Sequence, residues 1–179
     1  INGVSTGVSA LGGYASSLYG KTVSVLGDSI STYSGYIPSD HRARYPQANL
    51  DMPDVDHTWW KSLINDTGAS LGMNDSWAGS RVSNSSDSNS GDFGPDRCMA
   101  SMTRINNLAA NGIPDIIFFY GGTNDVGGGV TVGDFDPTKT YTYEESSKKW
   151  TTFADAYRTA IMRMEHTYPN TKIVAMIPT

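Results

Sequence analysis

Predominantly apolar runs occur in three segments of the chain, 22–26, 116–120 and 172–178. A strand that is covered on both faces carries apolar side chains throughout, so each run predicts a buried strand. A further short strand is predicted around residues 69–73, before a turn with the sequence Asn74-Asp75-Ser76-Trp77-Ala78-Gly79.

Between these strands, apolar residues recur every three or four positions, which predicts helices with one buried face. The first helix starts near Thr58 and is stopped by Gly68, and the second ends at Gly112 and Pro114. The third helix is opened by a capping-box pair, Thr142 and Glu145. The predicted buried faces carry Trp59, Trp60, Leu63 and Ile64; Cys98, Met102, Ile105, Leu108 and Ala109; and Phe153, Tyr157, Ile161 and Met164.

Strands and helices alternate along the whole chain, so we expect a parallel sheet with helices on both faces. A length of 179 residues fits one domain with one core. We place that domain at residues 21–179 and interpret residues 1–20, which lack periodicity, as a leader or edge segment. Polar loops are predicted at 31–57, 83–95 and 126–142.

Composition narrows the class of protein. A net charge of -5 argues against nucleic acid, which requires a basic surface, and no apolar run reaches the roughly 18 residues of a membrane span. Only 17% of residues are charged, while Ser, Thr, Asn and Gly are abundant. This polarity without charge is typical of secreted proteins that bind neutral, hydroxyl-rich ligands. We therefore expect an extracellular protein, and the start at Ile1 without a signal peptide is consistent with a processed chain.

Two polar, glycine-flanked tips follow predicted strands. Gly27-Asp28-Ser29-Ile30 comes directly after the first strand, and Gly121-Gly122-Thr123-Asn124-Asp125 follows the strand at 116–120. In open α/β sheets, reactive groups gather in the crevice at the carboxyl ends of the strands. A serine and an amide brought together in one crevice predict an active site.

Other motifs are weaker. An α/β-hydrolase elbow is disfavoured because Ser31 replaces the final glycine of Gly-x-Ser-x-Gly, and a dinucleotide loop fails because Val132 stands at the third glycine position. A calcium-loop spacing, Asp134, Asp136, Thr138, Thr140 and Glu145, has Lys139 where the required glycine would be. We expect no metal and no cofactor. The histidines at 41, 57 and 166 are each expected at the surface or at a helix end, and Cys98 is interpreted as a buried structural thiol.

Taken together, the tips resemble the SGNH hydrolases, the GDSL esterase and lipase superfamily. The first block is similar to Val25-Leu26-Gly27-Asp28-Ser29-Ile30, the glycine block to Ala78-Gly79-Ser80, and the Gly-x-Asn-Asp block to Gly122-Thr123-Asn124-Asp125. The blocks occur in the family's order from about Lys21 to Thr179. The resemblance implies a three-layer, flavodoxin-like α/β fold.

The resemblance also implies roles for the residues of the blocks. Ser29 would be the nucleophile, and the N–H groups of Ser29 and Gly79 with the Asn124 amide would form an oxyanion hole. Neighbouring residues in the same blocks, Asp28, Thr123 and Asp125, are candidates for substrate binding.

One part of the family pattern is missing from these residues. The family has a fourth block, Asp-x-x-His, near its C-terminal end, which supplies the general base and its orienting acid. Asp54 and His57 have this spacing but lie between the first strand and the first helix, too early in the chain. We expect the base beyond Thr179, in a C-terminal segment or a neighbouring domain, so that the sheet here lacks its C-terminal strand and covering helix.

The sequence therefore predicts a serine esterase that hydrolyses short, acetyl-type esters on carbohydrate through an acyl-enzyme. The alternatives are a non-catalytic carbohydrate-binding or structural module with the same fold, or a lipase or thioesterase of the same superfamily. A flavodoxin-like cofactor binder, which would carry a coloured flavin, ranks last.

Overall fold

A single parallel sheet organises the part of the chain that the computed structural model describes, residues 17–48, 52–84, 94–134, 136, 138, 150 and 152–178. Its four strands run in the order β2-β1-β3-β4. They are β1 (Thr22–Gly27), β2 (Ser70–Ser76), β3 (Ile116–Tyr120) and β4 (Lys172–Met176). The parallel sheet predicted from the apolar runs is confirmed, and β1 and β3 lie at its centre.

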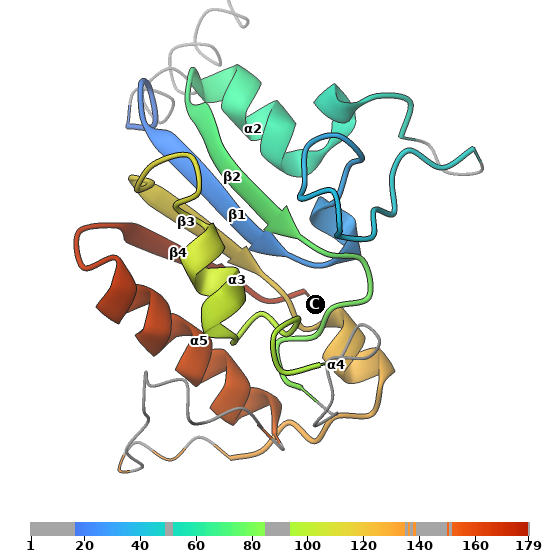
Figure 1. The fold of residues 1–179 in the computed structure, drawn as a ribbon, viewed down its shortest axis with the longest axis vertical. Helices are drawn as coiled ribbons and strands as arrows, with labels where there is room; N and C mark the ends of the chain where they lie inside the picture. Colours follow the sequence, from blue (N-terminus) through green and yellow to red (C-terminus); the bar gives the residue numbers. More distant parts are fainter. Residues whose placement is uncertain are drawn as a thin grey trace, which may run out of the picture.

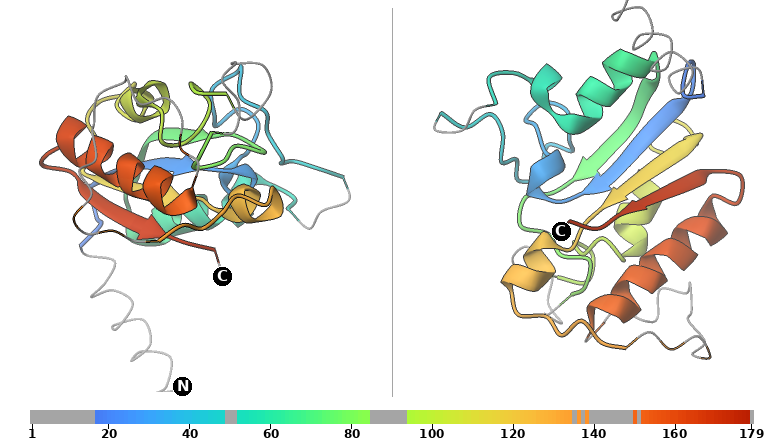
Figure 2. Two further views of the ribbon diagram at one scale, coloured as in Figure 1. Left: turned by 90° about the horizontal axis from the view of Figure 1, so that it is seen from below. Right: turned by 180° about the vertical axis from the view of Figure 1, so that it is seen from behind.

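Helices cover both faces of the sheet, which gives the three layers expected (Figure 1). Helix α2 (Trp59–Thr67) packs on one face, while α3 (Met102–Asn107) and α5 (Phe153–Thr167) pack on the other, as the view along the sheet in Figure 2 shows. Three short helical segments lie in the connections: η1 (Ser29–Ser31), η2 (Val55–His57) and α4 (Thr123–Gly127). None of the described helices is both long and apolar enough to cross a membrane.

Alternate residues of the central strands supply the two halves of the core. On the α3 and α5 face, Leu26, Ile117 and Phe119 join one buried cluster with side chains of both helices. Val23 and Phe118 join clusters on the α2 face, where Trp60 and Ile64 are buried. Because each central strand is covered on both sides, both of its faces are buried, and the polar Ser24 of β1 is satisfied by donating to the Leu108 carbonyl at 2.8 Å.

Helix α2 begins and ends where the sequence predicts. Gly68 follows it with a φ of 70°, a left-handed conformation that glycine adopts without strain, and its N–H donates to the Ile64 carbonyl. Of the four side chains predicted to face inward, Trp60 and Ile64 are buried, while Trp59 and Leu63 are partly buried.

Strand β2 is longer than predicted, because residues interpreted as a turn belong to it. Asn74, Asp75 and Ser76 continue the strand and are almost completely buried. Polar residues are stable in such a place only when they are hydrogen-bonded, and each of these is. The Asn74 amide donates to the Ser31 carbonyl at 2.9 Å, and Asn74 Oδ1 accepts from the Ser76 hydroxyl at 2.6 Å.

Two helices differ from the prediction at their starts. Cys98 precedes α3, whose N-cap is Ser101, so the helix is shorter than its apolar pattern indicated. Burial raises the pKa of the Cys98 thiol to about 12, and the prediction of a buried thiol is confirmed. Helix α5 is capped by Thr152, whose hydroxyl accepts from the Asp155 N–H. The predicted capping pair, Thr142 and Glu145, lies outside the described residues.

Candidate active site

The predicted nucleophile lies where β1 turns into η1 at the carboxyl edge of the sheet. Asp28 caps this segment, since its Oδ1 accepts the Ile30 N–H at 3.0 Å. Ser29 is the first residue of η1 and is partly exposed. Within the described ranges, its hydroxyl has no hydrogen-bond partner. The serine is therefore presented on a fixed turn with its oxygen free.

Residue 27 must be glycine because the neighbouring serines leave no space for a side chain at this turn. A Cβ there would lie 2.7 Å from the Ser31 hydroxyl and 2.8 Å from the Ser76 hydroxyl. Real Cβ atoms do not approach other atoms so closely, so a side chain would push η1 away from β2. The glycine thus keeps Ser29 close to the end of β2.

The glycine block forms a tight turn beside the end of β1. Gly79 has a φ of 89°, which favours glycine. The Trp77 N–H donates to the Gly27 carbonyl at 3.1 Å, and the Ser80 N–H donates to the Trp77 carbonyl at 3.1 Å. Gly79 is thus held next to the residue that precedes Asp28 and Ser29.

Asn124, on α4, closes the third side of the site. Its Nδ2 donates to the Ser80 carbonyl at 2.8 Å, which ties α4 to the glycine turn. Asp125 strengthens this tie, because its carboxylate accepts the N–H groups of Val82 and Ser83 at 2.8 and 3.0 Å. The segments that carry Ser29, Gly79 and Asn124 are joined into one edge of the sheet.

The three candidate substrate-binding residues differ in exposure. Thr123 is exposed, whereas Asp28 and Asp125 are almost completely buried. Burial raises the pKa of Asp28, opposed by the Ile30 N–H and the Thr123 hydroxyl. Its second oxygen, Oδ2, has no hydrogen-bond partner of good geometry in the described part of the chain.

No histidine of the described residues is hydrogen-bonded to Ser29. His57 Nδ1 and Asp54 Oδ1 are 2.8 Å apart, and this bond lowers the pKa of Asp54, but the pair is exposed on η2. His41 is packed against Trp77, and its Nδ1 donates to the Ser76 carbonyl at 3.1 Å. His166 lies near the end of α5.

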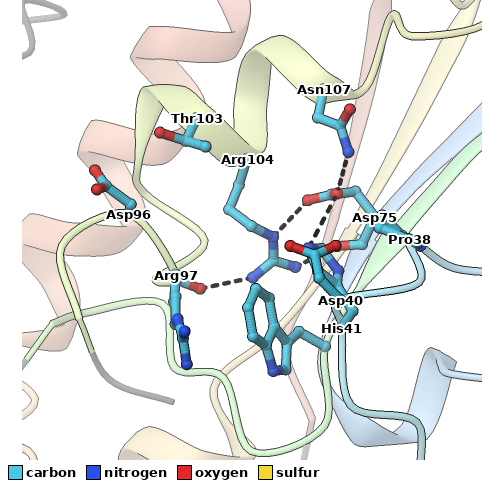
Figure 3. Close-up of a pocket in the computed structure, with 10 residues that line it drawn as sticks. Pro38, Asp40, His41, Asp75, Asp96, Arg97, Thr103, Arg104 and Asn107 are labelled. Carbon is cyan, nitrogen blue, oxygen red and sulfur yellow. Dashed lines mark hydrogen bonds and ion pairs between the residues drawn. The ribbon is translucent and has the colours of Figure 1, made fainter. Parts of the chain in front are cut away.

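A cavity of about 470 Å³ lies between β2, α3 and the loop at 38–41 (Figure 3). Its inner wall holds an ion pair between Asp75 and Arg104, whose side chains are 1% and 2% exposed. Arg104 also donates to the Gly27 carbonyl at 3.2 Å, directly below the nucleophile turn. None of Ser29, Gly79 and Asn124 lines this cavity.

The described residues contain no cluster of three or more His, Cys, Asp or Glu side chains that could hold a metal ion. Two residues of the predicted calcium-like spacing, Thr140 and Glu145, lie outside the residues that the structure describes.

The sequence profile of the GDSL-like lipase/acylhydrolase family matches residues 21–179. The chain belongs to this family. A candidate GDSL-like lipase from Bacteroides uniformis is 33% identical, with a TM-score of 0.70 over 87% of this chain and 70% of that one. A second candidate, from Bacteroides ovatus, is also 33% identical, with a TM-score of 0.70 over 89% and 73% of the two chains.

More distant similarity supports the fold alone. A protein from Lactobacillus plantarum is 19% identical, with a TM-score of 0.56 over 89% of this chain and 57% of that one. No curated protein matches the chain with comparable significance.

Membership of the GDSL-like lipase/acylhydrolase family supports ester hydrolysis in general, in agreement with the resemblance drawn from the three blocks. Sequence reasoning missed two residues that contact the candidate site, Arg42 at the Ala78 carbonyl and Arg104 at the Gly27 carbonyl. Arg42 is one of them: it lies in a polar loop without periodicity, so no sequence signal marked it. Arg104 lies on α3, where the apolar periodicity marks the buried face but gives no signal for a buried arginine.

Proposed function

We propose that the protein is a serine esterase in which the Ser29 hydroxyl attacks the carbonyl carbon of an ester. The alcohol leaves, a Ser29 acyl-enzyme remains, and water releases the acid. One observation carries the proposal. Within the described residues, the N–H groups of Ser29 and Gly79 have no acceptor, while those of Ile30, Ala78 and Ser80 are all hydrogen-bonded.

These two N–H groups, with the Asn124 amide, would hold the negative oxygen of the tetrahedral intermediate. The amide nitrogen of Asn124 carries two hydrogens, and the bond to Ser80 uses one of them. Donors fixed in advance stabilise a developing charge without reorganisation, so they accelerate its formation. The turn, the cap and α4 supply that fixed arrangement.

The general base would be the histidine of the family's Asp-x-x-His pair. No histidine of the described residues is hydrogen-bonded to Ser29, so we propose that a C-terminal segment or a neighbouring domain supplies this pair. Its histidine would take the proton from Ser29 and return it to the leaving alcohol.

For the substrate we propose a short acyl group on a carbohydrate, in an extracellular setting. The support is compositional: only 17% of residues are charged, while Ser, Thr, Asn and Gly are abundant. Thr123 is exposed and available to a substrate hydroxyl, whereas the buried Asp28 and Asp125 would act by holding the loops.

A fluorophosphonate probe tests the nucleophile directly. This reagent phosphonylates an activated serine, so the full-length protein should gain the mass of one adduct, and peptide mapping should place it on Ser29. The Ser29→Ala variant should gain none. An adduct that persists in Ser29→Ala, or no adduct on a chain that carries an Asp-x-x-His pair, would contradict the serine-esterase assignment and favour a binding module.

We expect Asn124→Ala to reduce kcat/KM for p-nitrophenyl acetate by about 100- to 1,000-fold, the usual cost of losing one oxyanion donor. Asn111→Ala is the matched control, because the Asn111 amide also donates to a backbone carbonyl, that of Gly72, at 2.8 Å. Both variants lose one such bond, but only Asn124→Ala should lose activity. Equal activity in the two variants would remove Asn124 from the oxyanion hole.

A further inference from the structure

The loop that carries Arg42 contacts the glycine turn through two hydrogen bonds between Arg42 and Ala78. The Ala78 N–H donates to the Arg42 carbonyl at 2.8 Å, and Arg42 Nη2 donates to the Ala78 carbonyl at 2.9 Å. One residue therefore holds both the peptide before Ala78 and the peptide after it. The second contact matters more, because the Ala78 carbonyl and the Gly79 N–H belong to the same peptide group.

A trans peptide is planar, and its C=O and N–H point in opposite directions. The Ala78–Gly79 bond is trans, since Tyr45–Pro46 is the cis bond found in the described chain. When the guanidinium holds the Ala78 oxygen on one side, the Gly79 N–H must point to the opposite side. The unpartnered Gly79 N–H is thereby aimed away from the Arg42 loop.

The contact also changes how strongly that N–H can donate. A cationic donor on the carbonyl oxygen polarises the peptide, and such charge-assisted bonds are about twice as strong as neutral ones. Hydrogen bonds in a chain strengthen one another, by roughly 10–30% per bond. Arg42 would therefore strengthen the hydrogen bond from the Gly79 N–H to an oxyanion by polarising the peptide between them. The guanidinium itself need not touch the substrate.

The loop is held in place by the residue before Arg42. His41 stacks on the Trp77 ring with centroids 4.0 Å apart, and its Nδ1 is 3.1 Å from the Ser76 carbonyl. Residues 41 and 42 thus contact Ser76, Trp77 and Ala78 in turn. Figure 3 shows His41 and Asp40 among the residues that line the cavity, whereas Arg42 donates to the Ala78 carbonyl of the glycine turn.

From these contacts we infer that Arg42 is a positioning residue of the oxyanion hole, which orients and polarises the Ala78–Gly79 peptide. The inference rests on the proposed function, because it gives the Gly79 N–H a catalytic task. It extends that proposal to a residue that lies outside every block of the family resemblance.

The test compares Arg42→Met with Arg44→Met in the full-length protein. Arg44 is an exposed arginine of the same loop. Its N–H donates to the Thr32 hydroxyl and its guanidinium lies over the Tyr45 ring, so Arg44→Met removes the same charge without touching Ala78. We expect Arg42→Met to lower kcat for p-nitrophenyl acetate about tenfold, less than the loss of a whole oxyanion donor, with little change in KM. Arg44→Met should leave both constants unchanged.

A trifluoromethyl ketone separates positioning from a merely structural role. It forms a hemiketal oxyanion with the nucleophile, so its Ki should rise in Arg42→Met by the same factor as kcat falls. Arg42→Lys keeps one cationic donor, so its changes in kcat and Ki should be smaller than those of Arg42→Met. If Arg42→Met does not fold, the comparison of Arg42→Lys with the wild type decides the test. A fall in kcat with unchanged Ki would overturn the inference.

The failure of each proposal has its own signature. If Ser29→Ala hydrolyses the ester as well as the wild type, the serine-esterase mechanism fails, and the role of Arg42 fails with it. If activity depends on Ser29 but Arg42→Met behaves like Arg44→Met, the esterase stands and the Arg42 inference is wrong.

Discussion

Replacing Ser29 with alanine should abolish ester hydrolysis while leaving the stability of the fold nearly unchanged. Loss of a serine nucleophile typically lowers kcat by roughly 10⁴-fold or more, because the acyl-enzyme can no longer form. The free energy of unfolding should stay nearly the same, because the Ser29 hydroxyl has no hydrogen-bond partner in the ranges the structure describes. Steady-state kinetics and urea unfolding of the same preparation measure the two effects.

Ser31 offers the matched control, two residues away in the same short helix. Its hydroxyl accepts from Trp59 Nε1 at 3.0 Å, so Ser31→Ala leaves an indole N–H without a partner, at a cost of about 1–3 kcal/mol. Ser31→Ala should therefore lose stability and keep most of its activity when folded, the opposite of Ser29→Ala. If both variants lost activity equally, Ser29 would be no more than another residue that shapes the turn.

Much of the frame was predictable because apolar patterning follows directly from burial. The runs at 22–26 and 116–120 became the two central strands, since a strand covered by helices on both faces is apolar along most of its length. Gly68 marked the end of α2 through its left-handed backbone. The clustering of the three blocks was also foreseeable, because carboxyl ends of parallel strands share one edge.

What the pattern missed depends on contacts between distant residues. Asp75 looked like a turn residue because no local signal announces that Arg104, 29 positions away, will neutralise it inside the protein. No local signal showed that Gly27 is required for the space beside Ser31 and Ser76. Arg42 and Ala78 are 36 positions apart and meet only through the folded loop.

The second large effect concerns that buried ion pair below the nucleophile turn. Arg104→Met should lower the free energy of unfolding by about 3–5 kcal/mol, because it leaves the Asp75 carboxylate buried without its counter-charge. The loss extends further, since Arg104 also donates to the carbonyls of Arg97, at 2.7 Å, and Gly27, at 3.2 Å. Urea unfolding measures the change. Lys21→Met, which breaks the exposed pair with Asp115, should cost no more than about 1 kcal/mol.

A double-mutant cycle distinguishes the charge from the packing. In the wild type, Asp75→Asn should be destabilising, because it leaves Arg104 as an unpaired buried cation. In the Arg104→Met background, Asp75→Asn should be stabilising, because it removes the uncompensated carboxylate. The new amide oxygen can still accept the hydrogen bond from Asn107, which is 2.6 Å long in the wild type. The sign of the Asp75→Asn effect should therefore reverse between the two backgrounds. An equal loss in both would mean that the pair is not coupled and that the network stabilises the turn through packing alone.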